Sequence, residues 1–135
     1  MCMRISSQHS RAPWVVIVAL LGGCASVDVR YPDGRHERMS KAEFKAYAER
    51  VFRYQNHIVD RLIIADEQGE PDARLLGAEE TMEVACRPLI ALVSAKAEHR
   101  ALQMSDKLEM PRAAPACEQA VAAVDALLPA APTHR

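Results

Sequence analysis

The fold is decided by residues 40–67, which read SKAEFKAYAERVFRYQNHIVDRLIIADE. The first of them, Ser40, stands three residues before Glu43, which is the spacing of a capping box at a helix start. Apolar side chains then recur every three or four residues, the period of one face of an α-helix. They are Phe44, Tyr47, Val51, Tyr54, Ile58, Leu62 and Ala65. Because no glycine or proline intervenes before Gly69, we predict one long packed helix over 40–67.

A second apolar stripe follows this helix. After Asp72, whose side chain suits a helix N-cap, apolar residues again recur at helical spacing and predict a helix over 73–103. The stripe comprises Leu75, Ala78, Met82, Ala85, Leu89 and Val93. Pro88 lies inside it, and a proline lacks the N–H of the helical hydrogen bond and clashes with the preceding turn. We therefore predict a kink near Pro88.

The rest of the chain predicts a loop and a short third helix. Pro111 and Pro115 place residues 105–115 in the loop, because proline disrupts a helix interior. Helical spacing of apolar side chains resumes afterwards and predicts a helix over 116–128. Three apolar stripes joined by short connections pack most simply as an up-down-up bundle. The predicted fold class is therefore all-α, a small three-helix bundle, with residues 40–135 as the helical domain.

Residues 24–39 precede this domain. The sequence VDVRY at residues 27–31 alternates apolar and polar side chains, and the PDG that follows it is a turn signal. We predict a short β-hairpin near 27–39. Since an isolated two-stranded ribbon is only marginally stable, an extended tether is the alternative.

The composition favours helices and excludes one class of partner. Aromatic residues make up only 4% of the 135 residues, and there are 5 glycines, which suits a helical protein better than a sheet protein. Lys and Arg number 17 against 18 Asp and Glu, for a net charge of -1. With no basic excess to neutralise a phosphate backbone, nucleic acid is not an expected partner.

The first 23 residues have the pattern of a secretory signal peptide. Arg4 and Arg11 supply positive charge, and the apolar run WVVIVALL follows at residues 14–21. Such a run is far shorter than the roughly 20 residues of a membrane-spanning helix, but it fits the apolar core of a signal. Directly after it, the tetrapeptide LGGC ends at Cys24. This motif resembles the lipobox of bacterial lipoproteins, in which a leucine and two small residues precede the modified cysteine.

The resemblance implies cleavage between Gly23 and Cys24 and attachment of lipid to the Cys24 thiol. A diacylglycerol there, usually joined by a third chain on the amine, exceeds the two signals that stable membrane anchoring requires. By the same resemblance Ala25, in place of the aspartate that retains lipoproteins in the inner membrane, implies the outer membrane facing the periplasm. The expected location is thus the bacterial cell envelope, with the membrane as a partner through the lipid anchor.

Two of the four cysteines remain for pairing in the mature chain. Cys2 leaves with the leader, and Cys24 is committed to lipid by the resemblance. Cys86 and Cys117 form an even pair in an oxidising compartment, which favours a disulfide between them. A bridge that closes a loop of roughly 30 residues would stabilise the fold by about 3–4 kcal/mol. Two buried free thiols are the alternative.

No motif points to catalysis, to a cofactor or to a resident metal. His57 and Asp60 lie one turn apart on the first predicted helix, but without a third ligand they are typical of an ordinary polar face. The chain has no Gly-x-Ser-x-Gly element and no glycine-rich loop for phosphate. We therefore expect a non-enzymatic protein.

The first helix carries a candidate contact surface. Phe52, Arg53 and Tyr54 combine aromatic and arginine side chains, which are favoured at protein interfaces. We expect a protein-interaction or envelope-structural role, with another envelope protein as the partner. The alternative is a small-ligand binder with a pocket between helices, lined by Met82, Phe44 and their neighbours.

Overall fold

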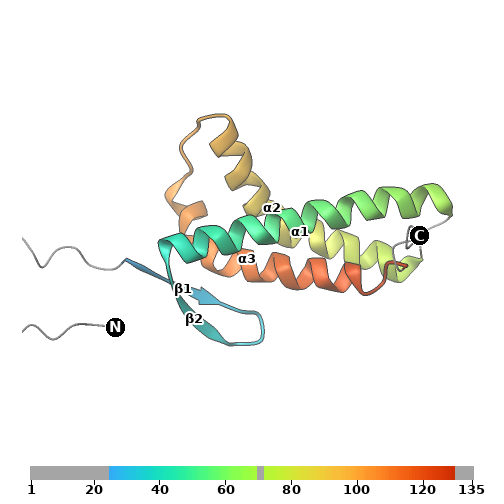
Figure 1. Cartoon of the computed structure of the whole chain (residues 1–135), viewed down its shortest axis with the longest axis horizontal. Helices are drawn as coiled ribbons and strands as arrows, with labels where there is room; N and C mark the ends of the chain where they lie inside the picture. The colour runs from blue at the N-terminus through green and yellow to red at the C-terminus, as the bar shows by residue number, and fades with distance from the viewer. Residues whose placement is uncertain (1–24, 70–71, 130–135) are drawn as a thin grey trace, which may run out of the picture.

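The computed structural model describes residues 25–69 and 72–129. Its elements are β1 (Ser26–Arg30), β2 (His36–Ser40), α1 (Lys41–Gln68), α2 (Ala73–Ala97) and α3 (Met104–Asp125). The three helices run up, down and up along a common axis, and the hairpin lies beside the start of α1 (Figure 1). The prediction of a small three-helix bundle preceded by a hairpin is confirmed.

α1 begins where the sequence predicts. The Ser40 hydroxyl accepts the backbone N–H of Glu43 at 3.2 Å, and the Glu43 carboxylate accepts the backbone N–H of Ser40 at 2.7 Å, so both bonds of the capping box form. The helix ends at Gln68, next to the predicted end at residue 67. Its buried face comprises Tyr47, Ala48, Val51, Gln55, Ile58 and Leu62. The predicted packed helix is therefore present.

α2 starts at its predicted cap and bends near its proline. The Asp72 carboxylate accepts the backbone N–H of Arg74 at 3.2 Å. Pro88 lies inside the helix, and in Figure 1 the second half of α2 turns away from the bundle axis. The missing hydrogen bond and the ring clash of a proline account for this change of direction.

The end of α2 differs from the prediction. The helix stops at Ala97, not at residue 103. His99 adopts the left-handed region with φ 54°, and the backbone N–H of Arg100 donates to the Ala95 carbonyl at 2.8 Å. This is the geometry of a Schellman end, usually built on glycine. A histidine in that role leaves no glycine signal in the sequence, so the predicted extension to 103 is wrong.

The start of α3 also differs from the prediction. The helix begins at Met104 and contains both Pro111 and Pro115, so the predicted loop over 105–115 is wrong, and so is the predicted helix start at residue 116. Tertiary packing overrides the helix-breaking tendency of proline here, since the ring of Pro115 is fully buried. The buried residues of this stretch are Met110, Ala114, Pro115 and Cys117.

The segment before α1 is a hairpin and not an extended tether. β1 and β2 pair antiparallel, with Ser26 opposite Ser40, and Gly34 takes φ 87° in the turn. A left-handed φ of this kind is easily reached only by glycine. Val29 of β1 is fully buried in the core, and β1 packs against α3 while β2 packs against α1. This packing stabilises a ribbon that would be marginal alone.

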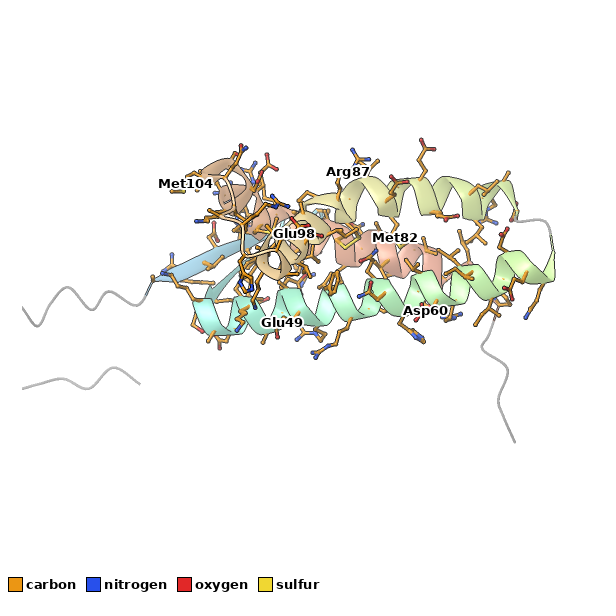
Figure 2. The ribbon with its side chains drawn as sticks, turned by 90° about the horizontal axis from the view of Figure 1, so that it is seen from above. Glu49, Asp60, Met82, Arg87, Glu98 and Met104 are labelled. Carbon is orange, nitrogen blue, oxygen red and sulfur yellow. A yellow bond between two sulfur atoms is a disulfide. The ribbon has the colours of Figure 1, made fainter. Side chains whose placement is uncertain are left out.

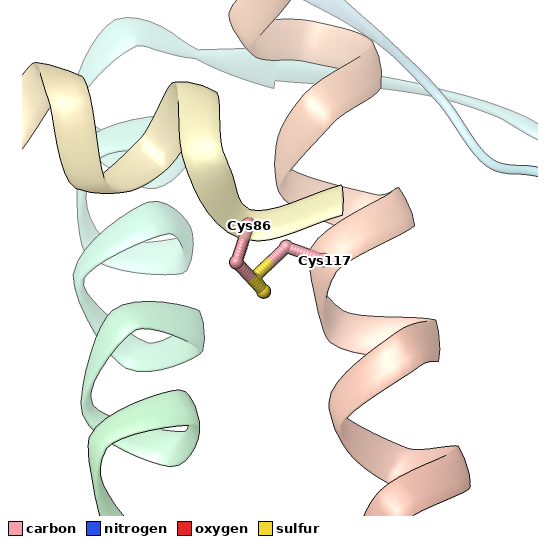
Figure 3. Close-up of a disulfide and its surroundings, with 2 residues drawn as sticks. All are labelled: Cys86 and Cys117. Carbon is pink, nitrogen blue, oxygen red and sulfur yellow. A yellow bond between two sulfur atoms is a disulfide. The ribbon is translucent and has the colours of Figure 1, made fainter. Parts of the chain in front are cut away.

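A disulfide joins α2 to α3. The sulfur atoms of Cys86 and Cys117 lie 2.06 Å apart and their Cα atoms 4.5 Å apart (Figure 3). Both residues are fully buried, and the short Cα–Cα distance shows that the two helix backbones approach closely at this point. The predicted pairing is present, but Cys117 lies in the middle of α3 and not at its start.

α3 holds the bundle together. It packs extensively against α2 and to a lesser degree against α1, whereas α1 and α2 make little contact with each other. Because α2 packs closely against α3, it lies further from α1. The gap that opens between α1 and α2 positions the candidate site.

Candidate functional site

A groove lies between the second half of α1 and α2. It has a volume of about 600 Å³ and is open to solvent. Its apolar lining comprises Val59, Leu62, Ile63, Ala65, Leu75, Leu76, Met82, Ile90 and Leu127. Figure 2 shows Met82 between α2 and α1. Several lining side chains stay exposed, with Ile63 at 56%, Leu76 at 49% and Ile90 at 36%, so the groove offers apolar surface that the fold does not bury.

Gln55 is a buried polar residue in this groove. Its side chain lines the groove and is only 8% exposed, and its Oε1 atom has no hydrogen-bond partner among the described residues. Leaving a buried amide oxygen without a donor is costly, by about 1–3 kcal/mol. The oxygen has almost no accessible surface in this conformation, so a donor in the groove reaches it only when the side chain turns towards the groove.

Sequence reasoning missed Gln55, although a signal was present. The residue lies on the apolar face of α1, four positions after Val51 and three before Ile58, both of which are fully buried. A polar side chain at core spacing marks a hydrogen bond to the protein, to ordered water or to a ligand. Among the described residues its Oε1 atom has no partner.

The groove has an acidic lining. Four carboxylates contribute to it: Asp66 on α1, Asp72 at the cap of α2, and Glu79 and Glu83 on α2. Glu83 lies 3.6 Å from the exposed guanidinium of Arg87, while the lining itself contains no Lys, Arg or His among the residues that the structure describes. The groove thus combines apolar walls with an excess of negative charge.

A ladder of polar contacts keeps α1 in place against α3. The Tyr47 hydroxyl donates to the Glu118 carboxylate at 2.6 Å, and seven residues further on the Tyr54 hydroxyl donates to Asp125 at 2.7 Å. Arg61, after another seven residues, forms a salt bridge with Asp125. The two tyrosine contacts are seven residues apart on both helices, which requires α1 and α3 to run parallel and in register. The ladder therefore fixes one wall of the groove.

The ladder perturbs the pKa values of its members. Burial, followed by the hydrogen bond to Asp125, raises the pKa of Tyr54 to about 12. Burial and the bond to Glu118 raise the pKa of Tyr47 still further above its usual range. The hydrogen bonds from Tyr54 and Arg61 hold the pKa of Asp125 below its ordinary value. At neutral pH both tyrosines are donors and Asp125 is a charged acceptor.

The predicted contact surface on α1 is divided by the fold. Tyr54 is directed to Asp125 of α3, Phe52 is half-buried against the core, and Arg53 is exposed. The three residues thus lie at different depths, and their interaction role stays a prediction.

Of the two residues predicted to line a pocket, Met82 lies in the groove, whereas Phe44 is not among its lining residues. The ring of Phe44 instead lies near that of Tyr47, with 6.4 Å between the two ring centroids.

The leader and the lipobox lie outside the described residues, so the predicted cleavage between Gly23 and Cys24 and the lipid on Cys24 stay predictions. Within residues 25–69 and 72–129, none of the helices combines the length and the apolarity that crossing a bilayer requires. The same ranges contain no group of three or more His, Cys, Asp or Glu side chains placed to hold a metal ion.

Comparisons with known proteins identify no relative of this chain. No family model matches it, and neither does any curated protein or solved structure. Its function is therefore argued from its own residues.

Proposed function

We propose that this protein is a non-enzymatic lipoprotein, anchored through Cys24 in the outer membrane and facing the periplasm, which binds another envelope protein through the α1–α2 groove. The anchor rests on the resemblance of the LGGC motif to a lipobox. The binding role rests on one observation, the open groove in which apolar side chains such as Leu76 remain exposed. Exposed apolar surface of this kind is typical of an interaction site.

The positions of anchor and groove support the proposal. β1 begins at Ser26, two residues after Cys24, so the hairpin end of the bundle would lie next to the membrane. On α1 the groove starts at Gln55, about 20 Å along the helix from Lys41, and continues to Gln68 at the far end. A lipid-anchored bundle would therefore hold its groove away from the bilayer, within reach of a partner.

The groove also gives some support to a second function. Its volume of about 600 Å³ lies in the usual range for small-molecule sites, roughly 300–1,000 Å³, and Met82 lies in its lining. Native mass spectrometry of the protein extracted from membranes tests this alternative. A bound small molecule that is lost from a Met82→Trp variant would favour it over protein binding.

Two measurements test the main proposal. Metabolic labelling with palmitate should mark the wild-type chain and not a Cys24→Ser variant, and continued labelling of the variant would refute the anchor. For the binding role, a photo-reactive amino acid is placed at Leu76 in the groove, at Arg53 in the predicted contact surface, or at Glu49 as an exposed control on α1. A specific protein adduct in membranes is expected from Leu76. An adduct from Arg53 alone would move the interface to that surface, and no adduct from either position would refute the interaction.

A further inference from the structure

The groove carries information on the chemistry of its partner. Its lining contains four carboxylates and, among the described residues, no Lys, Arg or His; only Glu83 has a basic neighbour, Arg87 at 3.6 Å, which lies outside the lining. Because like charges repel and low-dielectric walls focus the field, such a groove disfavours an acidic occupant and attracts a basic one. The apolar walls at the same time require apolar side chains from the occupant.

The dimensions of the groove fit one helix. Its lining extends from Gln55 to Gln68 on α1 and from Leu75 to Ile90 on α2. At 1.5 Å per residue each wall is about 20 Å long, which matches a helix of about 14 residues. An amphipathic helix docks in a groove of this kind through apolar anchors spaced three and four residues apart.

Building on the proposed function, we propose that the α1–α2 groove binds a cationic amphipathic helix of a partner protein. Its apolar face lies on exposed side chains such as Ile63 and Leu76, and its Lys or Arg residues pair with Glu79, Glu83, Asp66 and Asp72. When the Gln55 side chain, which lines the groove, turns towards the docked helix, one N–H donor of that helix bonds to its Oε1 atom. A long basic side chain suits this contact, because its stem packs on apolar surface while its head donates.

The test uses the full chain in nanodiscs of zwitterionic lipid, with empty nanodiscs as the blank. Three fluorescent peptides of about 14 residues are titrated by anisotropy. The first is helical, with leucines on one face and lysines on the other; the second carries glutamates in place of the lysines; the third has the composition of the first in scrambled order. We expect the first peptide to bind at least about tenfold more tightly than the other two. Equal binding of the three, or no binding, overturns the proposal.

Variants locate the site. Glu79→Lys combined with Glu83→Lys should weaken binding of the cationic peptide by about tenfold or more. Glu49→Lys, an exposed change near the other end of α1 (Figure 2), should change it less than about twofold. Equal effects per charge in the double variant and in the Glu49→Lys variant would mean non-specific charge attraction and would overturn the groove assignment.

Gln55→Leu separates the ligand contact from a structural role. Removing the unpaired acceptor should leave the thermal midpoint unchanged or higher, while peptide binding weakens by about two- to tenfold. A lower midpoint together with unchanged binding would overturn the role of Gln55.

Two other possible occupants of the groove would give distinct experimental results. If a second copy covers the groove, sedimentation of the full chain in detergent gives a dimer that Leu76→Glu dissociates. If the C-terminal residues cover it, deletion of residues 130–135 tightens peptide binding by more than about tenfold. Either result overturns the partner helix as the occupant. A protein adduct at Leu76 without peptide binding would overturn this inference and leave the proposed function standing.

Discussion

Removal of the Cys86–Cys117 bridge, which lies in the apolar core, is expected to cause a large loss of stability. The two cysteines are 31 residues apart, and a cross-link closing a loop of that length restricts the unfolded chain by about 3.5–4 kcal/mol. For a domain of roughly 100 residues this corresponds to a fall of about 15–20 °C in Tm.

The assay is urea unfolding followed by circular dichroism, on three samples: oxidised wild type, reduced wild type, and Cys86→Ala with Cys117→Ala. The reduced wild type keeps both sulfur atoms in the core, so it loses the loop restriction but little packing. The double variant also loses two fully buried sulfur atoms and should be less stable again by about 1–2 kcal/mol. A reduced wild type within about 1 kcal/mol of the oxidised protein would refute the loop-closure reasoning.

Three further predictions concern the ladder, the glycines and the cap. Since the folded-state pKa of Asp125 lies below its unfolded value, its stabilisation is complete above the unfolded pKa and is lost as the pH falls through the folded one. Asp125→Asn should therefore lower the free energy of unfolding by about 1 kcal/mol at pH 7, and its difference from wild type should shrink as the pH falls below the unfolded pKa in parallel urea titrations. Two Gly→Ala changes should shift the free energy of unfolding in opposite directions. Gly34→Ala should lower it by about 1 kcal/mol, because alanine is strained in the left-handed turn, whereas Gly77→Ala, in open space within α2, should raise it by about 0.5–1 kcal/mol. Ser40→Ala should lower the free energy of unfolding by about 1 kcal/mol, because the helix cap is lost. An unchanged midpoint in thermal unfolding would contradict a capping role for Ser40.

Local signals in the sequence were sufficient to predict much of the helical bundle. The capping box of Ser40 and the apolar period after it determined the start and the buried face of α1, because both depend on residues within a few turns of each other. The bend of α2 followed from Pro88, whose chemistry acts on the preceding turn. The pairing of Cys86 with Cys117 followed from counting thiols and not from geometry.

The helix boundaries between α2 and α3 depended on tertiary structure. His99 ends α2 in a left-handed conformation that the sequence signals only weakly, since glycine is the usual residue there. α3 continues through Pro111 and Pro115 because burial of the stretch against the rest of the core outweighs the loss of helical hydrogen bonds. Such burial cannot be deduced from neighbours in the sequence.

The sequence by itself determined the helical class and the start of α1 and favoured the cysteine pair, because each rests on local chemistry or on residue count. It left a hairpin and an extended tether open for residues 27–39, and only the packing of β1 against α3 and of β2 against α1 decided between them. Only the tertiary structure determined the groove. It exists because α3 packs closely against α2 and is joined to it by the Cys86–Cys117 bridge, which leaves α1 and α2 apart. The same packing places Gln55 in the groove without a donor among the described residues. A gap between two helices depends on how each packs against a third, and this packing cannot be deduced from the apolar periodicity of a single helix.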